Sequence, residues 1–328
     1  MRIPPLVSIC CTAYNHEKYI RSAIEGFLMQ KTTFPIEIII HDDASTDNTA
    51  KIIMEYAVKN PDLIIPVLQT ENQISKKLGS NLVRFVFPRA AGKYLALCDG
   101  DDFWTNPLKL QKQVDELGKY HDCYICFHPA SVYDEAEKKT VKIIGQNDSL
   151  RRILSPREVI LGGGGFMPTC SLVLNRTVFD NLPDWFIKVP VSDYYLQILG
   201  SLNGGALFLK ETMSVYRINV KGSWTDRFNN PDLRLNYYQR QLEALNLAEN
   251  NLQEYKNELT LVKRDLIKNL LIDRFIPVKA RKEIFDNNVG YLKIKTRIAW
   301  NLIYKNKLFN NLLTSIKENL ILPIKRKS

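Results

Sequence analysis

An apolar run ends in three closely spaced carboxylates in the stretch Tyr94-Leu95-Ala96-Leu97-Cys98-Asp99-Gly100-Asp101-Asp102. We expect residues 94–98 to form a buried strand, because strands of a parallel sheet that are covered on both faces are apolar throughout. Carboxylates this close repel one another unless a cation compensates them, and a divalent cation is the usual reason for such crowding. The pattern therefore favours a Mg²⁺-type site over its alternative, a solvated acidic turn that begins the next helix.

Apolar runs and helical patterns alternate on the amino-terminal side of this stretch. The predicted elements are strands at 6–11, 36–40 and 64–69 and helices at 17–28, 49–60 and 81–87. Such alternation is typical of right-handed crossovers, which build a mostly parallel sheet with helices on both faces. The predicted fold class is therefore α/β, and ligands of such sheets bind beyond the carboxyl ends of the strands.

Polar segments follow three of these strands. They are Thr12-Ala13-Tyr14-Asn15, His41-Asp42-Asp43-Ala44-Ser45-Thr46-Asp47 and Asp99-Gly100-Asp101-Asp102-Phe103-Trp104. No glycine-rich phosphate loop follows the first strand, which disfavours a dinucleotide or a P-loop nucleotide. Asp43 is suited to accept a hydrogen bond from a nucleobase and Tyr14 to stack on it, although a turn aromatic is an equal alternative for Tyr14. We expect Ser45 or Asp47 to cap the following helix.

The remainder of the chain is less regular. The predicted elements are a helix at 108–120, strands at 124–128, 171–174 and 206–209, and a helix that begins near residue 191. Residues 134–158 are polar and charged, which indicates a surface excursion. Glycines 162–165 suit either a flexible acceptor loop or a plain connector. After about residue 224 the sequence changes to long helical patterns, so we expect a domain over 1–225 and a helical carboxyl-terminal extension over 226–328.

Composition narrows the class of partner. Lys and Arg number 45 against 35 Asp and Glu, a net charge of +10, which favours an anionic partner such as a nucleic acid, a phosphorylated substrate or a lipid surface. No apolar run approaches the roughly 18 to 20 residues that span a bilayer, and no signal-type run begins the sequence. We therefore expect a cytoplasmic protein. Cys123-x-x-Cys126 lacks a second Cys/His pair at zinc-finger spacing, which argues against a structural metal.

These segments together resemble the inverting family 2 glycosyltransferases of the GT-A fold. The matching stretches are Val7-Ser8-Ile9-Cys10-Cys11-Thr12-Ala13-Tyr14-Asn15-His16-Glu17-Lys18-Tyr19, Asp42-Asp43-Ala44-Ser45-Thr46-Asp47 and Gly92-Lys93-Tyr94-Leu95-Ala96-Leu97-Cys98-Asp99-Gly100-Asp101-Asp102-Phe103-Trp104. The resemblance is close over about 120 residues. It extends, less tightly, through Ser192-Asp193-Tyr194 and Tyr216-Arg217-Ile218-Asn219 to about residue 225. It implies a nucleotide-sugar-binding half over 1–120 and an acceptor and catalytic-base half over 121–225.

The resemblance also implies roles for matching residues. The nucleotide-sugar would be bound by Thr12, Ala13, Tyr14, Asn15, Asp43, Asp99, Gly100, Asp101 and Arg217. Within this set Tyr14 would stack on the base, Asp43 would read it and Asp99 would contact the ribose. Asp101, with Asp99, would hold a Mg²⁺ or Mn²⁺ ion that bridges the diphosphate. One departure is the segment 73–89, which lacks the Ala-Arg-Asn motif of the family and has Gly79-Ser80-Asn81 instead.

The acceptor side is implied in the same way. Asp193 would be the general base that removes the proton of the acceptor hydroxyl, although taken alone it reads as an acid at a helix N-terminus. Asp102 and Trp104 would line the acceptor pocket. We also expect Arg217 or Lys221 to contact the diphosphate, because both lie in the polar stretch that ends near residue 224.

The implied activity is metal-dependent, inverting transfer of a sugar from a nucleotide-diphosphate sugar, with a UDP-sugar favoured, to a hydroxyl of a glycan or lipid-linked glycan in polysaccharide biosynthesis. Direct transfer to a polyprenyl phosphate, which needs no strong base, is an alternative. A catalytically silent scaffold is a second, disfavoured because Asp99, Asp101 and Asp193 are intact. A basic nucleic-acid-binding protein is a third, disfavoured because the candidate site is acidic and would repel a phosphate backbone.

Positive charge gathers at the carboxyl end. Residues 289–328 hold nine Lys or Arg and one acid, Glu318, with apolar residues at helical spacing. A basic amphipathic helix of this kind favours contact with an anionic membrane surface. Packing of the helix on the catalytic domain is the alternative. We expect peripheral contact with the inner face of the cell membrane, where a lipid-linked acceptor would be presented.

Overall fold

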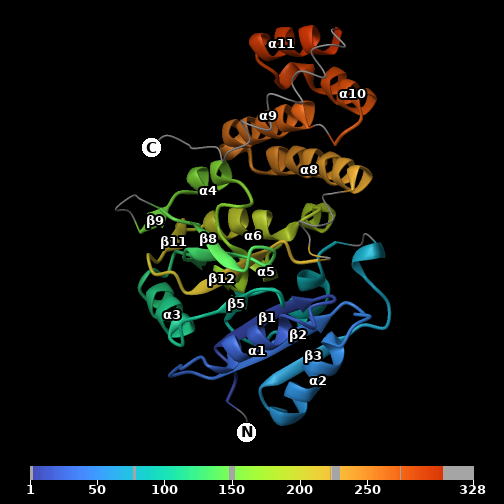
Figure 1. Cartoon of the computed structure of the whole chain (residues 1–328). Helices are drawn as coiled ribbons and strands as arrows, with labels where there is room; N and C mark the ends of the chain where they lie inside the picture. Colours follow the sequence, from blue (N-terminus) through green and yellow to red (C-terminus); the bar gives the residue numbers. More distant parts are fainter. Residues whose placement is uncertain are drawn as a thin grey trace. The chain divides into compact units, whose positions relative to one another are not determined.

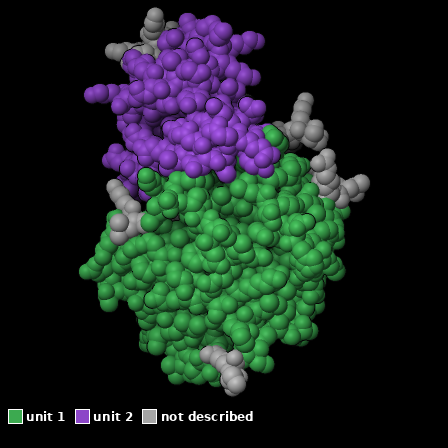
Figure 2. Space-filling view, turned by 180° about the vertical axis from the view of Figure 1, so that it is seen from behind, with its two compact units in different colours: residues 1–227 green, residues 228–328 purple. Residues whose placement is uncertain are grey.

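The computed structural model describes residues 3–76, 79–147, 152–221, 223, 230–273 and 275–305. The chain divides into two compact units, residues 1–227 and 228–328, which Figure 2 shows in different colours. The first unit contains two β-sheets with their helices. The described part of the second unit is helical.

An eight-stranded sheet forms the centre of the first unit, in the order β3-β2-β1-β4-β10-β6-β11-β9. Its strands are β1 (Val7–Ala13), β2 (Ile36–Asp42), β3 (Ile64–Leu68), β4 (Tyr94–Leu97), β6 (Ile125–Phe127), β9 (Ile153–Leu154), β10 (Val173–Asn175) and β11 (Ala206–Phe208). The first four strands in this order are parallel, as predicted. The other half is mixed, because β10 runs antiparallel to both of its neighbours and β9 runs antiparallel to β11.

Both faces of the parallel half are covered. Successive residues of a strand point to opposite faces, so Ile9 and Cys11 of β1 pack in one core with helix α1 (Ile20–Leu28), while Cys10 lies on the other face and is also buried. The π-helical turn η2 (Leu82–Val86) packs against β1 and β2. β1, β2 and β3 lie side by side in Figure 1, with α1 and α2 (Thr49–Lys59) beside them.

The segment predicted as a helix over 81–87 is one π-helical turn followed by a 3-10 turn, η3 (Phe87–Arg89). Pro88 explains why no longer helix forms, because proline has no N–H to donate to the preceding turn. Other helices of the first unit are α3 (Lys109–Lys119), α4 (Pro156–Gly162), α5 (Thr177–Asp180) and α6 (Ser192–Ser201). The short 3-10 turns are η1 (Ile74–Lys76), η4 (Thr169–Ser171) and η5 (Asp184–Lys188).

Much of the predicted surface excursion over 134–158 is exposed, but its described residues form strands and the start of a helix. A second sheet has the order β5-β12-β7-β8 and is built from β5 (Phe103–Trp104), β12 (Ser214–Ile218), β7 (Ala130–Asp134) and β8 (Lys139–Ile144). β8 pairs with β7 alone and is exposed along almost its whole length. An exposed edge strand carries lysines and polar residues that prevent further pairing, which is why its sequence looks like a surface loop. β9 and α4 also fall in this segment, and Ser155 and Glu158 form a capping box at the start of α4.

The second unit contains helices α8 (Pro231–Asn251), α9 (Lys256–Ile272), α10 (Val278–Asn288) and α11 (Ile294–Lys305), with the 3-10 turns η6 (Gln253–Tyr255) and η7 (Val289–Tyr291). Its core includes Ile267, Phe285 and Trp300. The side chain of Lys263 is buried and pairs with Glu249. Of the predicted basic segment 289–328, residues 306–328 lie outside the described part of the chain. None of the described helices is long and apolar enough to cross a bilayer.

Candidate active site

Hydrogen bonds fasten together the segments that follow β1, β2 and β4. The carbonyl of Ala13 accepts the amide of Asp43 at 3.0 Å, and the carbonyl of Thr12 accepts the amide of Gly100 at 2.8 Å. The Thr12 hydroxyl donates to Oδ1 of Asp99 at 2.5 Å. Because β1 lies between β2 and β4, these bonds bring three polar segments, far apart in the sequence, to one edge of the sheet.

The loops after β1 and β2 are tied a second time. The amide of Asn15 donates to the Ser45 hydroxyl at 2.9 Å, and Oδ1 of Asn15 accepts the amide of Thr46 at 2.8 Å. Asn15 has φ of 57°, a left-handed conformation in which Asn is one of the better tolerated residues. Asp47, not Ser45, makes the helix-capping bond: it accepts the amide of Thr49 at 2.9 Å, although it precedes the N-cap position by one residue.

Asp43 holds a neighbouring segment in place. Its residue is 2% exposed, and its two carboxylate oxygens accept the amides of Gln73 at 2.7 Å and Ile74 at 3.1 Å. A carboxylate oxygen has two acceptor positions, so these bonds leave acceptor capacity on each oxygen for a base. Tyr14, the first residue after β1, is half-buried.

The charges of Asp101 and Asp193 act on the carboxyl group of Asp99. Burial, together with the like charges of Asp101 and Asp193, raises the pKa of Asp99 to about 7, although the hydrogen bond from Thr12 acts in the opposite direction. Burial also raises the pKa of Asp193. Asp193 lies in the first turn of α6, where its oxygens accept the amide of Tyr194 at 2.9 Å and the hydroxyl of Thr169 at 3.1 Å.

Gly100 allows this close packing. A Cβ atom at this position would lie 2.9 Å from Cδ1 of Ile20, 3.0 Å from Nδ1 of His16 and 3.1 Å from Cβ of Ala13. Such distances are too short for any residue but glycine without a shift of the neighbours. His16 was not predicted to belong to the site, yet its Nε2 lies 3.8 Å from Oδ2 of Asp101 and its residue is 8% exposed. The sequence feature that could have indicated His16 is its place in the stretch 7–19 that resembles the family, two residues after Tyr14.

Asp102 does not line an acceptor pocket, which corrects the prediction. The residue is 1% exposed, and its Oδ1 accepts the backbone amide of Arg217 at 2.8 Å. It therefore fastens strand β12 to the loop after β4. Burial raises the pKa of Asp102 well above its usual value, because removal from water disfavours the charged form of a carboxyl group.

Arg217 braces the same region through contacts within the protein. Its Nη1 donates to the carbonyl of Asp101 at 2.6 Å, and its Nε lies 2.9 Å from Oε1 of Glu135. The guanidinium also stacks over Phe103, 4.3 Å from the ring centroid, and faces Tyr19 at 5.3 Å. These contacts leave the side chain 9% exposed and its charge paired.

Trp104 was also predicted to line the acceptor pocket, and the structure corrects this. The residue is 2% exposed, and its indole N–H donates to the carbonyl of Cys170 at 2.8 Å. The Trp104 ring packs edge-on against Phe27, with 4.9 Å between the ring centroids. Nζ of Lys109 lies 4.2 Å from the centroid of the Trp104 ring. A tryptophan with its N–H satisfied inside the core is a packing residue.

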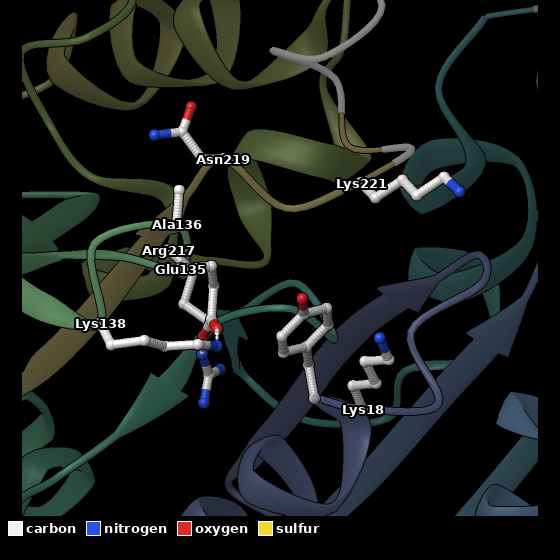
Figure 3. Close-up of a pocket in the computed structure, with 8 residues that line it drawn as sticks. Lys18, Glu135, Ala136, Lys138, Arg217, Asn219 and Lys221 are labelled. Carbon is white, nitrogen blue, oxygen red and sulfur yellow. Dashed lines mark hydrogen bonds and ion pairs between the residues drawn. The ribbon is translucent and has the colours of Figure 1, made fainter.

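A hollow of about 360 Å³ lies beside Arg217 (Figure 3). It is lined by Lys18, Tyr19, Glu135, Ala136, Lys138, Arg217, Asn219 and Lys221. Only Arg217 and Lys221 of this set were assigned a role from the sequence. Lys18, Tyr19 and Asn219 lie in the stretches that resemble the family, and the other three fall in the segment predicted to be a surface excursion.

A divalent cation fits the acids at the end of β4. Among the described residues, no three His, Cys, Asp or Glu side chains converge as a metal cluster. Mg²⁺ usually takes only one or two protein carboxylates and fills its other positions with water and substrate phosphates. Asp101 raises the pKa of Asp99 by like-charge repulsion, and a cation between the two would relieve it. The pair therefore suits a site that the substrate completes.

Comparison with solved structures shows the fold. The chain is similar to TarS of S. aureus in complex with UDP-GlcNAc, with a TM-score of 0.61 and 13% identity over 88% of this chain and 82% of that one. It is also similar to the mannosyltransferase PcManGT of Pyrobaculum calidifontis in complex with GDP-Man and Mn²⁺, with a TM-score of 0.54 and 14% identity over 95% and 84%. These neighbours confirm the predicted GT-A fold.

Sequence comparison shows the family. An uncharacterized protein of Mycobacterium tuberculosis is 41% identical over 227 residues, which are 67% of this chain, and the chain spans 62% of the length of that relative. The Escherichia coli protein WfgD, named as a UDP-Glc:α-D-GlcNAc-diphosphoundecaprenol β-1,3-glucosyltransferase, is 27% identical over 68% of this chain and 81% of its own. The model of glycosyl transferase family 2 matches residues 8–182, more than half of the sequence. The chain therefore belongs to glycosyltransferase family 2.

Proposed function

We propose that this protein transfers a sugar from a nucleotide-diphosphate sugar, with a UDP-sugar favoured, to a hydroxyl of a glycan or lipid-linked glycan, with inversion at the anomeric carbon. The observation that carries the proposal is the hydrogen-bonded edge of the sheet, where Thr12, Asp43 and Asp99 meet and Asp193 acts on Asp99. Two solved neighbours hold UDP-GlcNAc and GDP-Man, and one relative is named for transfer from UDP-Glc to a lipid-linked acceptor. This acceptor class fits the biosynthesis of a surface polysaccharide.

The donor would bind in the amino-terminal half, residues 1–120. Thr12, Ala13, Tyr14 and Asn15 would form the nucleoside pocket, with Tyr14 stacking on the base and the remaining acceptor capacity of Asp43 reading its N–H groups. Asp99 would contact the ribose. Gly100 supports this role because its missing side chain lets the loop after β4 approach the loop after β1.

Asp101, with Asp99, would hold the Mg²⁺ or Mn²⁺ ion. When bound there, such an ion neutralises the negative charge that develops on the departing diphosphate. One solved neighbour is in complex with GDP-Man and Mn²⁺. Asp99 and Asp101 would otherwise face a diphosphate with like charge, so the proposal makes donor binding dependent on the cation.

Asp193 would act as the general base from the half over 121–225. An acceptor hydroxyl must lose its proton as it attacks, and a carboxylate within hydrogen-bond reach can take it. Bonds from Tyr194 and Thr169 fix the direction of the carboxylate, and burial raises its pKa, which makes it a stronger base than an exposed aspartate. The start of α6 favours its ionised form.

The test is a calorimetric titration of the full chain with UDP-, GDP- and dTDP-sugars, each with Mn²⁺, with Mg²⁺ and with EDTA. We expect one nucleotide class to bind with either metal and to lose affinity in EDTA and in the Asp101→Asn variant. Asp115→Asn, an exposed acid of α3, is the matched control and should bind normally. No binding of any of the three classes with either metal would contradict the proposal.

An acceptor test separates the two enzyme classes. If a polyprenyl phosphate were the acceptor, its oxygen would already be ionised and no base would be needed. Full activity of Asp193→Asn toward a polyprenyl phosphate would therefore contradict a hydroxyl acceptor, and loss of activity would support it.

We also propose peripheral contact with the inner face of the cell membrane through the basic carboxyl-terminal segment. In its described part, helix α11 exposes Ile294 (70%), Ile298 (56%) and Leu302 (66%). Residues spaced by four lie on one face of a helix. The sequence beside these apolar residues is basic, with Lys293, Lys295 and Arg297. A basic helix with an apolar face suits binding to anionic lipid.

Sedimentation with vesicles tests this contact. We expect the chain to bind phosphatidylglycerol vesicles but not phosphatidylcholine vesicles, and Ile294→Glu/Ile298→Glu to abolish binding. Leu261→Glu, at an exposed apolar position of α9, is the matched control. Unchanged sedimentation of the double variant would contradict the contact.

A further inference from the structure

The hollow beside Arg217 gathers cations from three separate segments. Lys18 follows the end of β1, Lys138 lies between β7 and β8, and Lys221 follows β12. All three residues are exposed. Figure 3 shows Lys18 and Lys221 on one side of the hollow and the group of Lys138, Glu135 and Arg217 on the other.

The charges of this lining do not balance. Glu135 is its single carboxylate, and it pairs with Lys138 at 2.5 Å and with Arg217 at 2.9 Å. In the part of the chain that the structure describes, neither Lys18 nor Lys221 forms an ion pair. Four cations against one carboxylate give the lining a net charge of +3. A concave site lined by one sign of charge concentrates ligands of the opposite sign.

Arg217 keeps Glu135 from opposing an anion. Since the guanidinium is held by the Asp101 carbonyl and stacked over Phe103, it keeps a positive charge beside Glu135. Lys138 adds a second. The carboxylate of Glu135 is thereby compensated at one wall, and the opposite wall, with Lys18 and Lys221, carries the positive charge available to a ligand.

Most residues proposed to bind the nucleotide lie outside the hollow, whereas Arg217 and Lys221, which were expected near the diphosphate, line it. Thr12, Tyr14, Asp43, Asp99 and Asp101 do not line it. Arg217 links the two places through its bond to the Asp101 carbonyl. A ligand in the hollow would therefore lie close to Asp101 without occupying the proposed nucleoside pocket.

We propose that this hollow binds an acidic group, a carboxylate or a phosphate, carried by the sugar acceptor. The inference rests on the proposed function, because an acceptor presupposes a transferase. Lys18 and Lys221 would contact the acidic group, and Lys ammonium groups donate hydrogen bonds to carboxylates and phosphates alike. The site would make the enzyme select acidic glycans over neutral ones.

Saturation-transfer NMR on the full chain tests the site with three hexoses that differ in one substituent: glucose 6-phosphate, glucuronate and glucose. At low ionic strength we expect the two acidic sugars to bind and glucose not to bind. Lys18→Gln/Lys221→Gln should weaken the acidic sugars about tenfold, since two charge-assisted contacts are lost. Lys51→Gln/Lys59→Gln, which removes two exposed lysines of α2, is the control of equal charge change and should bind like the wild type.

Three outcomes would overturn the inference. If glucose binds as well as the acidic sugars, the hollow does not select for charge. If Lys18→Gln/Lys221→Gln retains its affinity for the acidic sugars, other residues hold the anion. If UDP with Mn²⁺ displaces the acidic sugars, the hollow belongs to the donor diphosphate.

A parallel titration with UDP-, GDP- and dTDP-sugars and Mn²⁺ distinguishes this failure from failure of the proposed function. If none of the three nucleotide classes binds while acidic sugars still bind selectively, the transferase is contradicted and the anion site is supported. If one nucleotide class binds normally and no acidic sugar binds, the anion site is contradicted and the transferase is supported.

Discussion

Gly100 offers a direct test of how the candidate site is assembled. A methyl group at this position would meet Cδ1 of Ile20, Nδ1 of His16 and Cβ of Ala13 at 2.9, 3.0 and 3.1 Å. The Ile20 atom is the end of a flexible side chain and can move. The Cβ of Ala13 moves only with the backbone of β1, so Gly100→Ala must separate the loop after β4 from the loop after β1.

The cost follows from these contacts. Inserting a methyl group into a packed interior costs about 1 to 3 kcal/mol. A domain of 150–250 residues loses roughly 2 to 4 °C in melting temperature per kcal/mol, so the first unit should melt about 2 to 12 °C lower. The bonds of Thr12 to Gly100 and Asp99 cross the same gap. We therefore expect UDP affinity to fall by about tenfold, which corresponds to ~1.4 kcal/mol.

Gly118 of α3 supplies the matched control. A Cβ atom there meets nothing within 4 Å, and replacing a helical glycine by alanine stabilises by about 0.5 to 1 kcal/mol. Thermal unfolding followed by circular dichroism and titration with UDP and Mn²⁺ measure both effects. If Gly100→Ala melts at the wild-type temperature and binds UDP with wild-type affinity, the close approach of the two loops does not hold the site together.

Three further variants probe separate parts of the argument. Asp193→Asn should lower kcat by roughly 10² to 10⁴ with UDP affinity unchanged. In the wild type, kcat should already decline at a pH above the ordinary pKa of aspartate, because burial raises the pKa of Asp193. Measuring kcat of the variant and of the wild type against pH tests both expectations. Trp104→Phe should cost about 1 to 3 kcal/mol in urea unfolding, since the carbonyl of Cys170 loses its buried partner. Lys263→Met should cost the second unit about 3 kcal/mol, because Glu249 loses its cationic partner and keeps the hydrogen bond from the Thr260 hydroxyl. Equal melting of variant and wild type in calorimetry would refute this.

The parallel half of the sheet could be predicted from sequence because its signals are local. Strands buried on both faces are apolar throughout, and the predicted bounds 36–40 and 94–98 lie within two residues of β2 and β4. The site edge follows from the same pattern, because the carboxyl ends of neighbouring parallel strands must meet. Thr12, Asp43 and Asp99 could therefore be expected together before any geometry was known.

Other features depend on partners that are distant in the chain. Trp104 looks like a pocket aromatic until the carbonyl of Cys170, 66 residues away, is seen to accept its N–H. Asp102 looks like a site acid until the amide of Arg217 meets it across 115 residues. Edge strand β8 was not predicted for another reason, because an exposed strand carries the same polar residues as a loop. In each case the side chain is chemically ambiguous, and only its buried partner decides its role.

Arg217 shows how this ambiguity bears on function. A motif match places an arginine near the diphosphate, but its charge is already committed to Glu135 and its donors partly to Asp101. Removing it would expose the Glu135 carboxylate to the hollow as well as loosen β12, so a loss of activity in Arg217→Ala would not identify a phosphate contact. Lys18 and Lys221 can be neutralised without disturbing any ion pair among the described residues. The question of what anion this region binds is therefore better put to the lysines than to the arginine.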